Sequence, residues 1–405
     1  MNNEKDFQPV LRFMTLSDIH VKDEHTVEED RLVKAVQTAA RLAREDEAYQ
    51  RLDALVIVGD FANSGSEIQM EKVKKAVYDN IPAETQVSVS LASHEYSTQN
   101  GGEEAALERF KRIFGLPCDD HRVINGFHFI NITSTKGCNY DEPKQQWAAE
   151  QLKIAAADDP KKPIFFFQHP HITDTVAGSI YWADDALIPY MVSYPQIIDF
   201  SGHSHVPVND PRSIHQRHFT CLGTGTLSYF ELDEFDKYYS TCPPQKEKAA
   251  QFLIVEADAA GRVRVYPYDL ITDRFFAKRW AIDTPWEPDS FCYTDDRMRT
   301  ANKPYFDGNA RISAEVKGNG VTVTFDQAKD DEEGFVDDYV VTVRNKDNVV
   351  VSRKCLWSEY YFNDMPASLA VPFEDLAAGE YTVQVFARSF WRVRSANTLQ
   401  APFTV

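Results

Sequence analysis

The chain has 405 residues, of which 43% are hydrophobic and 26% are charged, a composition typical of a soluble globular protein. Because a single core seldom grows beyond about 250–300 residues, we expect two domains. The formal net charge of −19 repels nucleic-acid backbones and anionic membranes, so neither DNA nor RNA is expected as the main partner. No apolar run approaches the roughly 20 residues of a membrane-spanning helix, so no membrane span is expected.

Two features of the sequence bear on the compartment. Residues 1–13 lack the apolar stretch of a secretory signal peptide, which predicts a cytoplasmic protein; export stays open if a signal was removed. The six cysteines include no CxxC pair, so they indicate neither a zinc finger nor a disulfide framework. We expect reduced thiols, with one or two disulfides as the alternative in an exported protein. The cysteines are Cys118, Cys138, Cys221, Cys242, Cys292 and Cys355.

Short apolar runs and helical patterns alternate along the first two thirds of the chain. A capping box at Thr26–Glu29 predicts the start of the first helix, and further helices are expected at 67–80 and around Trp147. This alternation predicts an α/β layered domain over residues 1–275, with a mixed or antiparallel contribution in its last part. The strands are expected at 11–17, 54–58, 87–91, 127–132, 164–167, 197–200, 217–222, 251–256 and 262–268.

The character of the sequence changes after residue 275. Residues 276–305 combine prolines with scattered aromatic residues and no clear period, which predicts a linker packed on the first domain. From residue 306 onward apolar and polar residues alternate, as in Val321, Val323 and Phe325. About seven short strands in this stretch predict a small all-β sandwich over 306–405.

Metal-type residues occur in five short clusters, each at the end of a predicted strand. Any one of them has an ordinary interpretation, as a capped turn or as a core histidine. Five in succession at strand ends indicate instead that their side chains converge on a metal site. The clusters are Asp18-Ile19-His20, Gly59-Asp60, Ser93-His94-Glu95, His169 and Gly202-His203-Ser204-His205.

The residue types indicate which chemistry such a site would perform. Mixed carboxylate and imidazole ligands suit manganese, iron or zinc better than calcium or magnesium. Asp60 is the natural candidate to bridge two ions, and two adjacent divalent ions can attack and hold a phosphate ester. His203 and His205, two apart on a strand, are expected to face one site. His94 is placed to protonate the leaving oxygen or to stabilise the developing charge.

In order and composition, these clusters resemble the motifs of the calcineurin-like metallophosphoesterase superfamily, which are DxH, GDxxxxG, GNH[ED], a later histidine and GHxH. The resemblance covers residues from about 10 to 270. It implies a pair of mixed β-sheets flanked by helices, and hydrolysis of a phosphomonoester or phosphodiester by a hydroxide that bridges two metal ions. It implies one ion held by Asp18, His20, Asp60 and His205, and a second held by Asp60, His169, His203 and Ser93.

One departure from the pattern leaves an alternative open. The superfamily has asparagine where this chain has Ser93, and a serine hydroxyl reaches less far than an amide oxygen. The alternative to a working hydrolase is therefore a catalytically impaired, phosphoesterase-like binding protein. The segment from Gly59 to Gly65 contains no tyrosine, which disfavours the purple acid phosphatase branch.

Two further expectations concern partners. The C-terminal sandwich resembles a fibronectin type III module, which implies docking to a protein or a glycan as a further role for the chain. The substrate is expected to be a small phosphoester, and its identity is expected to depend on three loops, at 97–126, 172–195 and 206–245.

Overall fold

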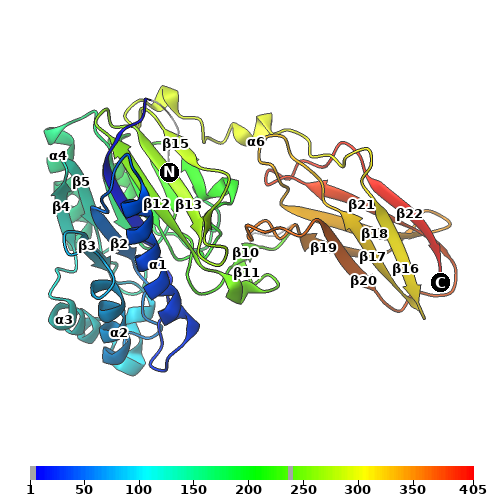
Figure 1. The fold of residues 1–405 in the computed structure, drawn as a ribbon, viewed down its shortest axis with the longest axis horizontal. Coiled ribbons are helices and arrows are strands. Elements are labelled where there is room, and N and C mark those ends of the chain that lie inside the picture. The colour runs from blue at the N-terminus through cyan, green and yellow to red at the C-terminus, as the bar shows by residue number, and fades with distance from the viewer. Residues whose placement is uncertain (1–5, 236–239) are drawn as a thin grey trace. The chain divides into compact units, whose positions relative to one another are not determined.

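The computed structural model describes residues 6–235 and 240–405, and it divides into two compact units at Thr294 and Asp295 (Figure 1). The division falls inside the segment 276–305, where the linker is predicted. Residues 1–5, part of the segment without a signal-like pattern, lie outside the described residues.

The first sheet of the N-terminal unit is mixed, with the strand order β14-β13-β12-β1-β2-β3 and β15 paired to β13. Strands β1, β2 and β3 are parallel, whereas β12 pairs antiparallel with both β1 and β13. The strands are β1 (Pro9–Leu16), β2 (Ala54–Val58), β3 (Gln86–Ser90), β12 (Gln251–Asp258), β13 (Val263–Asp269), β14 (Arg274–Phe275) and β15 (Trp280–Ile282).

The second sheet has the strand order β4-β5-β6-β7-β9-β8. Its four central strands are parallel, and β4 and β8 pair antiparallel at the two edges. The strands are β4 (Asp120–Ile124), β5 (Phe127–Asn131), β6 (Ile164–Gln168), β7 (Ile197–Ser201), β8 (Ile214–Gln216) and β9 (Thr220–Gly223). A separate short pair consists of β10 (Leu232–Asp233) and β11 (Ser240–Thr241).

The two sheets pack face to face, and helices cover their outer faces. Phe13 of β1 lies in the core between the sheets with Phe129, Phe165 and Phe200 of the second sheet. A second core joins the first sheet to α1 (Val27–Glu45), α2 (Glu67–Tyr78) and α3 (Gly102–Phe114). A third joins the second sheet to α4 (Glu142–Asp158) and α5 (Ile188–Met191). The predicted layered fold of two mixed sheets flanked by helices is confirmed.

Two local predictions were wrong. Thr26 does occupy the N-cap of α1, but its side chain makes no capping hydrogen bond, so the capping box is not formed. The segment 97–126 is not simply a loop, because it contains α3 and β4. None of the helices within the described ranges combines the length and apolar composition that crossing a bilayer requires.

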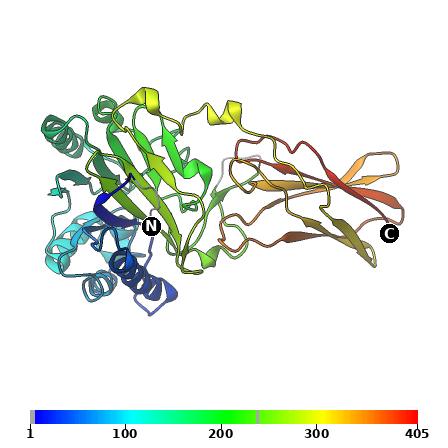
Figure 2. The same ribbon diagram turned by 45° about the horizontal axis from the view of Figure 1, so that its top comes forward.

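The C-terminal unit begins with α6 (Arg297–Thr300) and is otherwise an all-β sandwich of seven strands. Figure 2 shows its strands from a second direction. Its side chains alternate between core and solvent along β17, β20 and β21, as the period-two pattern predicts. One sheet has the order β16-β17-β20 and the other β19-β18-β21-β22, and one apolar core lies between them. The strands are β16 (Ile312–Lys317), β17 (Gly320–Asp326), β18 (Asp338–Asn345), β19 (Val350–Trp357), β20 (Ser368–Phe373), β21 (Glu380–Arg388) and β22 (Leu399–Thr404).

A fully buried acid in β7 makes the stability of the N-terminal unit sensitive to pH. Burial raises the pKa of Asp199 to about 8, and the Gln168 amide donates to both carboxylate oxygens at 3.0 Å. The folded state therefore keeps the Asp199 proton up to about pH 8, whereas the unfolded state releases it above about pH 4. The free energy of unfolding consequently falls as the pH rises from about 4 to 8.

The Asp199→Asn variant should remove this loss, because an amide of the same shape stays neutral. We expect its free energy of unfolding to exceed that of the wild type by more than about 1 kcal/mol at pH 8, with a smaller gain at pH 5. Urea denaturation at the two pH values measures the difference. An equal gain at both would contradict the buried neutral acid.

Candidate metal centre

The predicted ligands all lie just beyond the carboxyl ends of parallel strands. Strands β1, β2 and β3 are parallel in the first sheet, and β6 and β7 are parallel in the second. The carboxyl ends of parallel strands lie at the same edge of a sheet, so residues that are distant in the sequence come close together there. Asp18 and His20 follow β1, Asp60 follows β2, Ser93 follows β3, His169 follows β6, and His203 and His205 follow β7.

The backbone at most of these positions is left-handed. In non-glycine residues this conformation costs about 1 kcal/mol or more, and its concentration at one place is typical of a functional site. Close packing also requires glycines: a Cβ on Gly59 would lie 2.6 Å from His169 Nδ1, and one on Gly202 would lie 2.8 Å from Asp18 Oδ2. The left-handed ligands are Asp18 (φ 52°), His20 (φ 55°), Asp60 (φ 49°), His203 (φ 73°) and His205 (φ 55°).

Asp18, His20 and His205 form the first group of potential ligands, with their candidate donor atoms within 4.8 Å of one another. His205 Nε2 lies 3.3 Å from both Asp18 Oδ1 and His20 Nε2. The second oxygen of Asp18 accepts hydrogen bonds from the Ser17 hydroxyl and from the His203 backbone N–H, the latter at 2.9 Å. These bonds fix the carboxylate and leave Oδ1 directed at the imidazoles.

Asp60 lies between this group and the next. Its ligand atoms group with those of Asp18 and His169 on one side, and with those of His20 and His94 on the other. Asp60 Oδ2 is 3.1 Å from His169 Nε2, and Oδ1 accepts from the His94 backbone N–H at 2.9 Å. Because both of its neighbouring groups share members with the Asp18 group, the acidic and imidazole side chains form one continuous cluster.

Ser93 and His94 lie at the rim of this cluster. Ser93 Oγ donates to Asp60 Oδ2 at 3.1 Å, so the structure brings the predicted serine beside the predicted bridging carboxylate. The ring of His94 stands edge-on to that of His20, with centroids 4.4 Å apart.

His203 and His205 do not act as a pair on a strand, contrary to the prediction. Strand β7 ends at Ser201, and both histidines lie in the loop that follows. Their left-handed backbone sends the two rings to different groups: His205 joins Asp18, whereas His203 joins His169 and Cys138. The strand argument was therefore wrong in its geometry.

The hydrogen bonds of the imidazoles define which nitrogen faces the cluster. His169 Nδ1 donates to the Val58 carbonyl at 2.7 Å, and His205 Nδ1 donates to the Tyr229 carbonyl at 2.9 Å. His94 Nδ1 likewise donates to a backbone carbonyl at 3.0 Å. Since a carbonyl can only accept, Nδ1 of each ring carries a proton, and Nε2 is the nitrogen directed at the cluster.

The titration of the buried groups favours a cation. Burial and the charge of His205 lower the pKa of His20 to about 3, and burial and His169 lower that of His203 to about 4, so both are neutral ligands at pH 7. Burial would raise the pKa of Asp60, but the charge of His169 holds it well below its usual value. Burial would lower the pKa of His169, but Asp60 and Asp18 raise it well above its ordinary value. The two buried carboxylates thus stabilise a positive charge beside them, which can be a proton on an imidazole or a metal ion.

Unsatisfied buried atoms at the centre of the cluster are consistent with metal ions. Asp18 Oδ1 and His169 Nε2 make no hydrogen bond, although they lie only 3.9 Å from each other. A carboxylate oxygen and an imidazole nitrogen that has given up its proton to solvent are both metal donors, and buried polar atoms without partners are costly. The mixed oxygen and nitrogen donor set therefore fits a divalent transition metal.

Sequence reasoning missed the structural role of Glu95 and the presence of Cys138. Glu95 is fully buried and accepts from the backbone N–H groups of Asp60, Ala62 and Ala92 at 3.1, 2.7 and 2.9 Å. It thereby ties the loop after β2 to the loop after β3. Its position next to His94 was a usable signal, whereas Cys138 lies in a turn that no motif marks.

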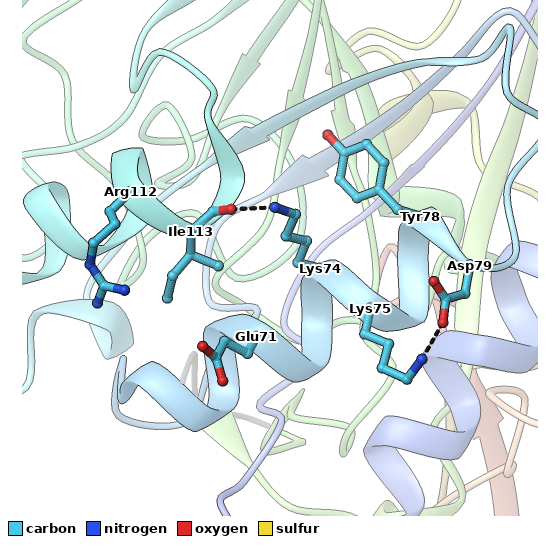
Figure 3. Close-up of a pocket in the computed structure, with 7 residues that line it drawn as sticks. All are labelled: Glu71, Lys74, Lys75, Tyr78, Asp79, Arg112 and Ile113. Carbon is cyan, nitrogen blue, oxygen red and sulfur yellow. Dashed lines mark hydrogen bonds and ion pairs between the residues drawn. The ribbon is translucent and has the colours of Figure 1, made fainter.

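A surface hollow of about 400 Å³ between α2 and α3 is separate from this cluster (Figure 3). Its charges are engaged locally: the Lys74 ammonium donates to the Ile113 carbonyl at 2.5 Å, Lys75 pairs with Asp79, and Arg112 pairs with Glu67. It contributes no member to the ligand groups found in the described ranges. The lining residues are Glu71, Lys74, Lys75, Tyr78, Asp79, Arg112 and Ile113.

Among solved structures, the chain is similar to purple acid phosphatase PPD1 from yellow lupin (Lupinus luteus) seeds, with 11% identity and a TM-score of 0.49. The match covers 70% of this chain and 55% of that chain, so this chain spans about half the length of the lupin protein. It is also similar to phosphopantetheinyl hydrolase (PptH) from Mycobacterium tuberculosis, with 12% identity, a TM-score of 0.31, and coverage of 54% of this chain and 91% of that chain. Comparison with curated proteins gives no match.

The family comparison coincides with the cluster. Residues 11–207 match the family model described as calcineurin-like phosphoesterase. This range begins within β1, before Asp18, and ends after His205, so it contains every predicted ligand. Over residues 11–207 the chain is therefore similar to the calcineurin-like phosphoesterases, the family whose motifs it resembles.

Proposed function

We propose that the N-terminal unit is a dinuclear metal-dependent phosphoesterase that hydrolyses a phosphomonoester or a phosphodiester. The observation that carries this proposal is the continuous cluster of carboxylates and imidazoles centred on Asp60, within the segment that matches the family. Two groups, one of Asp18, His20 and His205 and the other around His169 and His203, offer two ion positions, and the group of Asp18, Asp60 and His169 links them.

The side chains of the cluster have distinct tasks in this proposal. Asp18, His20 and His205 hold one ion, His169, His203 and Ser93 hold the other, and Asp60 is shared. Manganese, iron and zinc are the candidate ions. When bound, two such ions supply Lewis acidity that activates water and stabilises the charge on the phosphoryl oxygens. Glu95, through its three backbone hydrogen bonds, keeps Asp60 in register with the loop after β3.

His94 is the proposed proton donor to the leaving oxygen. Its Nδ1 is engaged by the Asn63 carbonyl, so Nε2 remains to contact substrate. Its ring is only partly buried, at the rim of the cluster, where a leaving group can exit to solvent. In its imidazolium form, which carries a second proton on Nε2, a histidine at this place can give that proton to the departing alkoxide or stabilise its charge.

Aromatic rings beside two of the proposed ligands support an organic phosphoester as substrate. The half-buried Trp182 packs edge-on against His203 with centroids 4.7 Å apart, and the half-buried Tyr229 lies 4.2 Å from the ring of His205. The exposed Lys246 ammonium is 5.2 Å from the Tyr229 ring centroid and adds a positive charge to an otherwise acidic chain. In this proposal the aromatic rings contact an apolar organic group of the ester, and the ammonium attracts its anionic phosphate.

The test is hydrolysis of p-nitrophenyl phosphate and of bis(p-nitrophenyl) phosphate by the full chain with added manganese, zinc or iron. We expect turnover of at least one ester, loss of turnover with a chelator, and two metal ions per chain by plasma mass spectrometry. If the chain binds two ions but hydrolyses no ester of a wider panel, the alternative holds, namely a catalytically impaired binding protein in which Ser93 replaces the usual asparagine. Less than one ion per chain and no turnover would overturn it. A docking role for the C-terminal unit stays a prediction.

A further inference from the structure

Cys138 lies in a rigid turn beside the second proposed ion position. The turn follows β5 and is closed by two backbone hydrogen bonds between Thr135 and Asn139, at 2.7 and 3.0 Å. The Ser134 hydroxyl donates to the Gly137 carbonyl at 2.6 Å and braces the turn from inside. The half-buried Cys138 side chain is therefore held in place rather than carried on a flexible loop.

The sulfur of Cys138 belongs to a group of potential ligands with His169 and His203. The three donor atoms lie within 4.8 Å of one another. An independent observation points to a ligand here: His169 Nε2 is fully buried and makes no hydrogen bond, and it lies 3.1 Å from Oδ2 of Asp60, the proposed shared ligand. Within the described ranges, the ligand groups include Cys138 and no other cysteine.

The surroundings of the thiol suit a bound cation. The contact with Ser93 places the sulfur next to the residue whose hydroxyl also reaches Asp60. A thiol that binds a metal ion releases its proton to solvent, and a divalent ion at His169 and His203 would supply the charge that drives this release.

We propose that Cys138 is a further, thiolate ligand of the second metal ion, in addition to His169, His203, Ser93 and the shared Asp60. This inference rests on the proposed dinuclear site and names a donor that the motif does not contain. The first position then offers only oxygen and nitrogen donors, whereas the second adds a soft sulfur. The second position therefore selects zinc or cobalt over manganese, because thiolates favour softer ions.

The first experiment reads the metal–sulfur bond directly. The full chain is stripped with a chelator and loaded with two equivalents of cobalt. We expect two bound cobalt ions and a sulfur-to-cobalt charge-transfer absorption in the near ultraviolet. That absorption should vanish in Cys138→Ser, with at least ~10-fold weaker binding of the second ion. It should persist in Cys118→Ser, a matched change of another half-buried thiol.

A second variant separates loss of the ligand from loss of the fold. Adding Ser93→Asn to Cys138→Ser offers an amide oxygen beside the same ion, so we expect the second cobalt to return without the sulfur absorption. X-ray absorption of the zinc-loaded wild type should show a sulfur neighbour at about 2.3 Å.

The failures of the two proposals are distinguishable. Two bound cobalt ions without the absorption, its survival in Cys138→Ser, or a zinc shell of oxygen and nitrogen alone would overturn the thiolate ligand and leave the dinuclear site standing. A chain that binds no cobalt would overturn both.

Discussion

Replacing Asp60 with asparagine should lower kcat/KM for phosphoester hydrolysis by more than roughly 10²-fold, the loss typical of removing one preorganised electrostatic group at a reacting centre. The change keeps the shape of the side chain but removes the charge that faces His169 at 3.1 Å. It also removes an oxygen that both ion positions share in the proposed site. We therefore expect the metal content to fall together with the rate, as measured by plasma mass spectrometry and steady-state kinetics on the same preparation.

The matched control for this variant is Asp199→Asn. Asp199 is an equally buried acid of the same unit, but it contacts Gln168 and is not a member of the ligand groups among the described residues. We expect it to keep both metal ions and a rate within about twofold of the wild type. If Asp60→Asn kept two ions and a rate within tenfold of the wild type, Asp60 would not be the shared ligand.

Replacing Phe13 with alanine should destabilise the N-terminal unit by about 3–5 kcal/mol, the usual cost of removing a buried aromatic ring. Phe13 is fully buried between the two sheets. Its ring makes edge contacts with four rings of the second sheet, at centroid distances of 4.9 to 5.9 Å. The substitution removes these ring contacts and leaves a cavity between the two sheets.

Urea denaturation monitored by tryptophan fluorescence measures this loss. The control is Val123→Ala on the edge strand β4, where the side chain is 55% exposed and the expected change is within about 0.5 kcal/mol. A loss below about 1 kcal/mol for Phe13→Ala would show that the two sheets do not depend on the packing of this ring.

The elements that are predictable from sequence are those whose hydrophobic pattern follows from the burial of the element itself. The buried run at 54–58 became β2 with the same bounds, because a short parallel strand covered on both faces is apolar throughout. The sandwich strands also followed from sequence, since one face of each is solvated and the side chains alternate. Helix α3 was missed because its residues were assigned to a substrate loop, although Ala106, Phe110 and Ile113 recur at helical spacing.

The sequence predicted which residues form most of the candidate site, but it did not predict how their side chains are arranged. Strand ends and residue types indicated Asp18, Asp60 and His169 as members of one cluster. The left-handed backbone that separates His203 from His205 depends on packing between loops, and no local pattern encodes it. The same holds for Cys138, which reaches His169 only because β5 and β6 are neighbours in the second sheet.

The most direct test of the central claim is a crystal structure of the full chain loaded with zinc or manganese, with anomalous diffraction recorded at the metal edge. The account predicts two peaks a few ångströms apart, one contacted by Asp18, His20 and His205 and the other by His169 and His203, with Asp60 touching both. A single peak, or peaks away from Asp60, would contradict it.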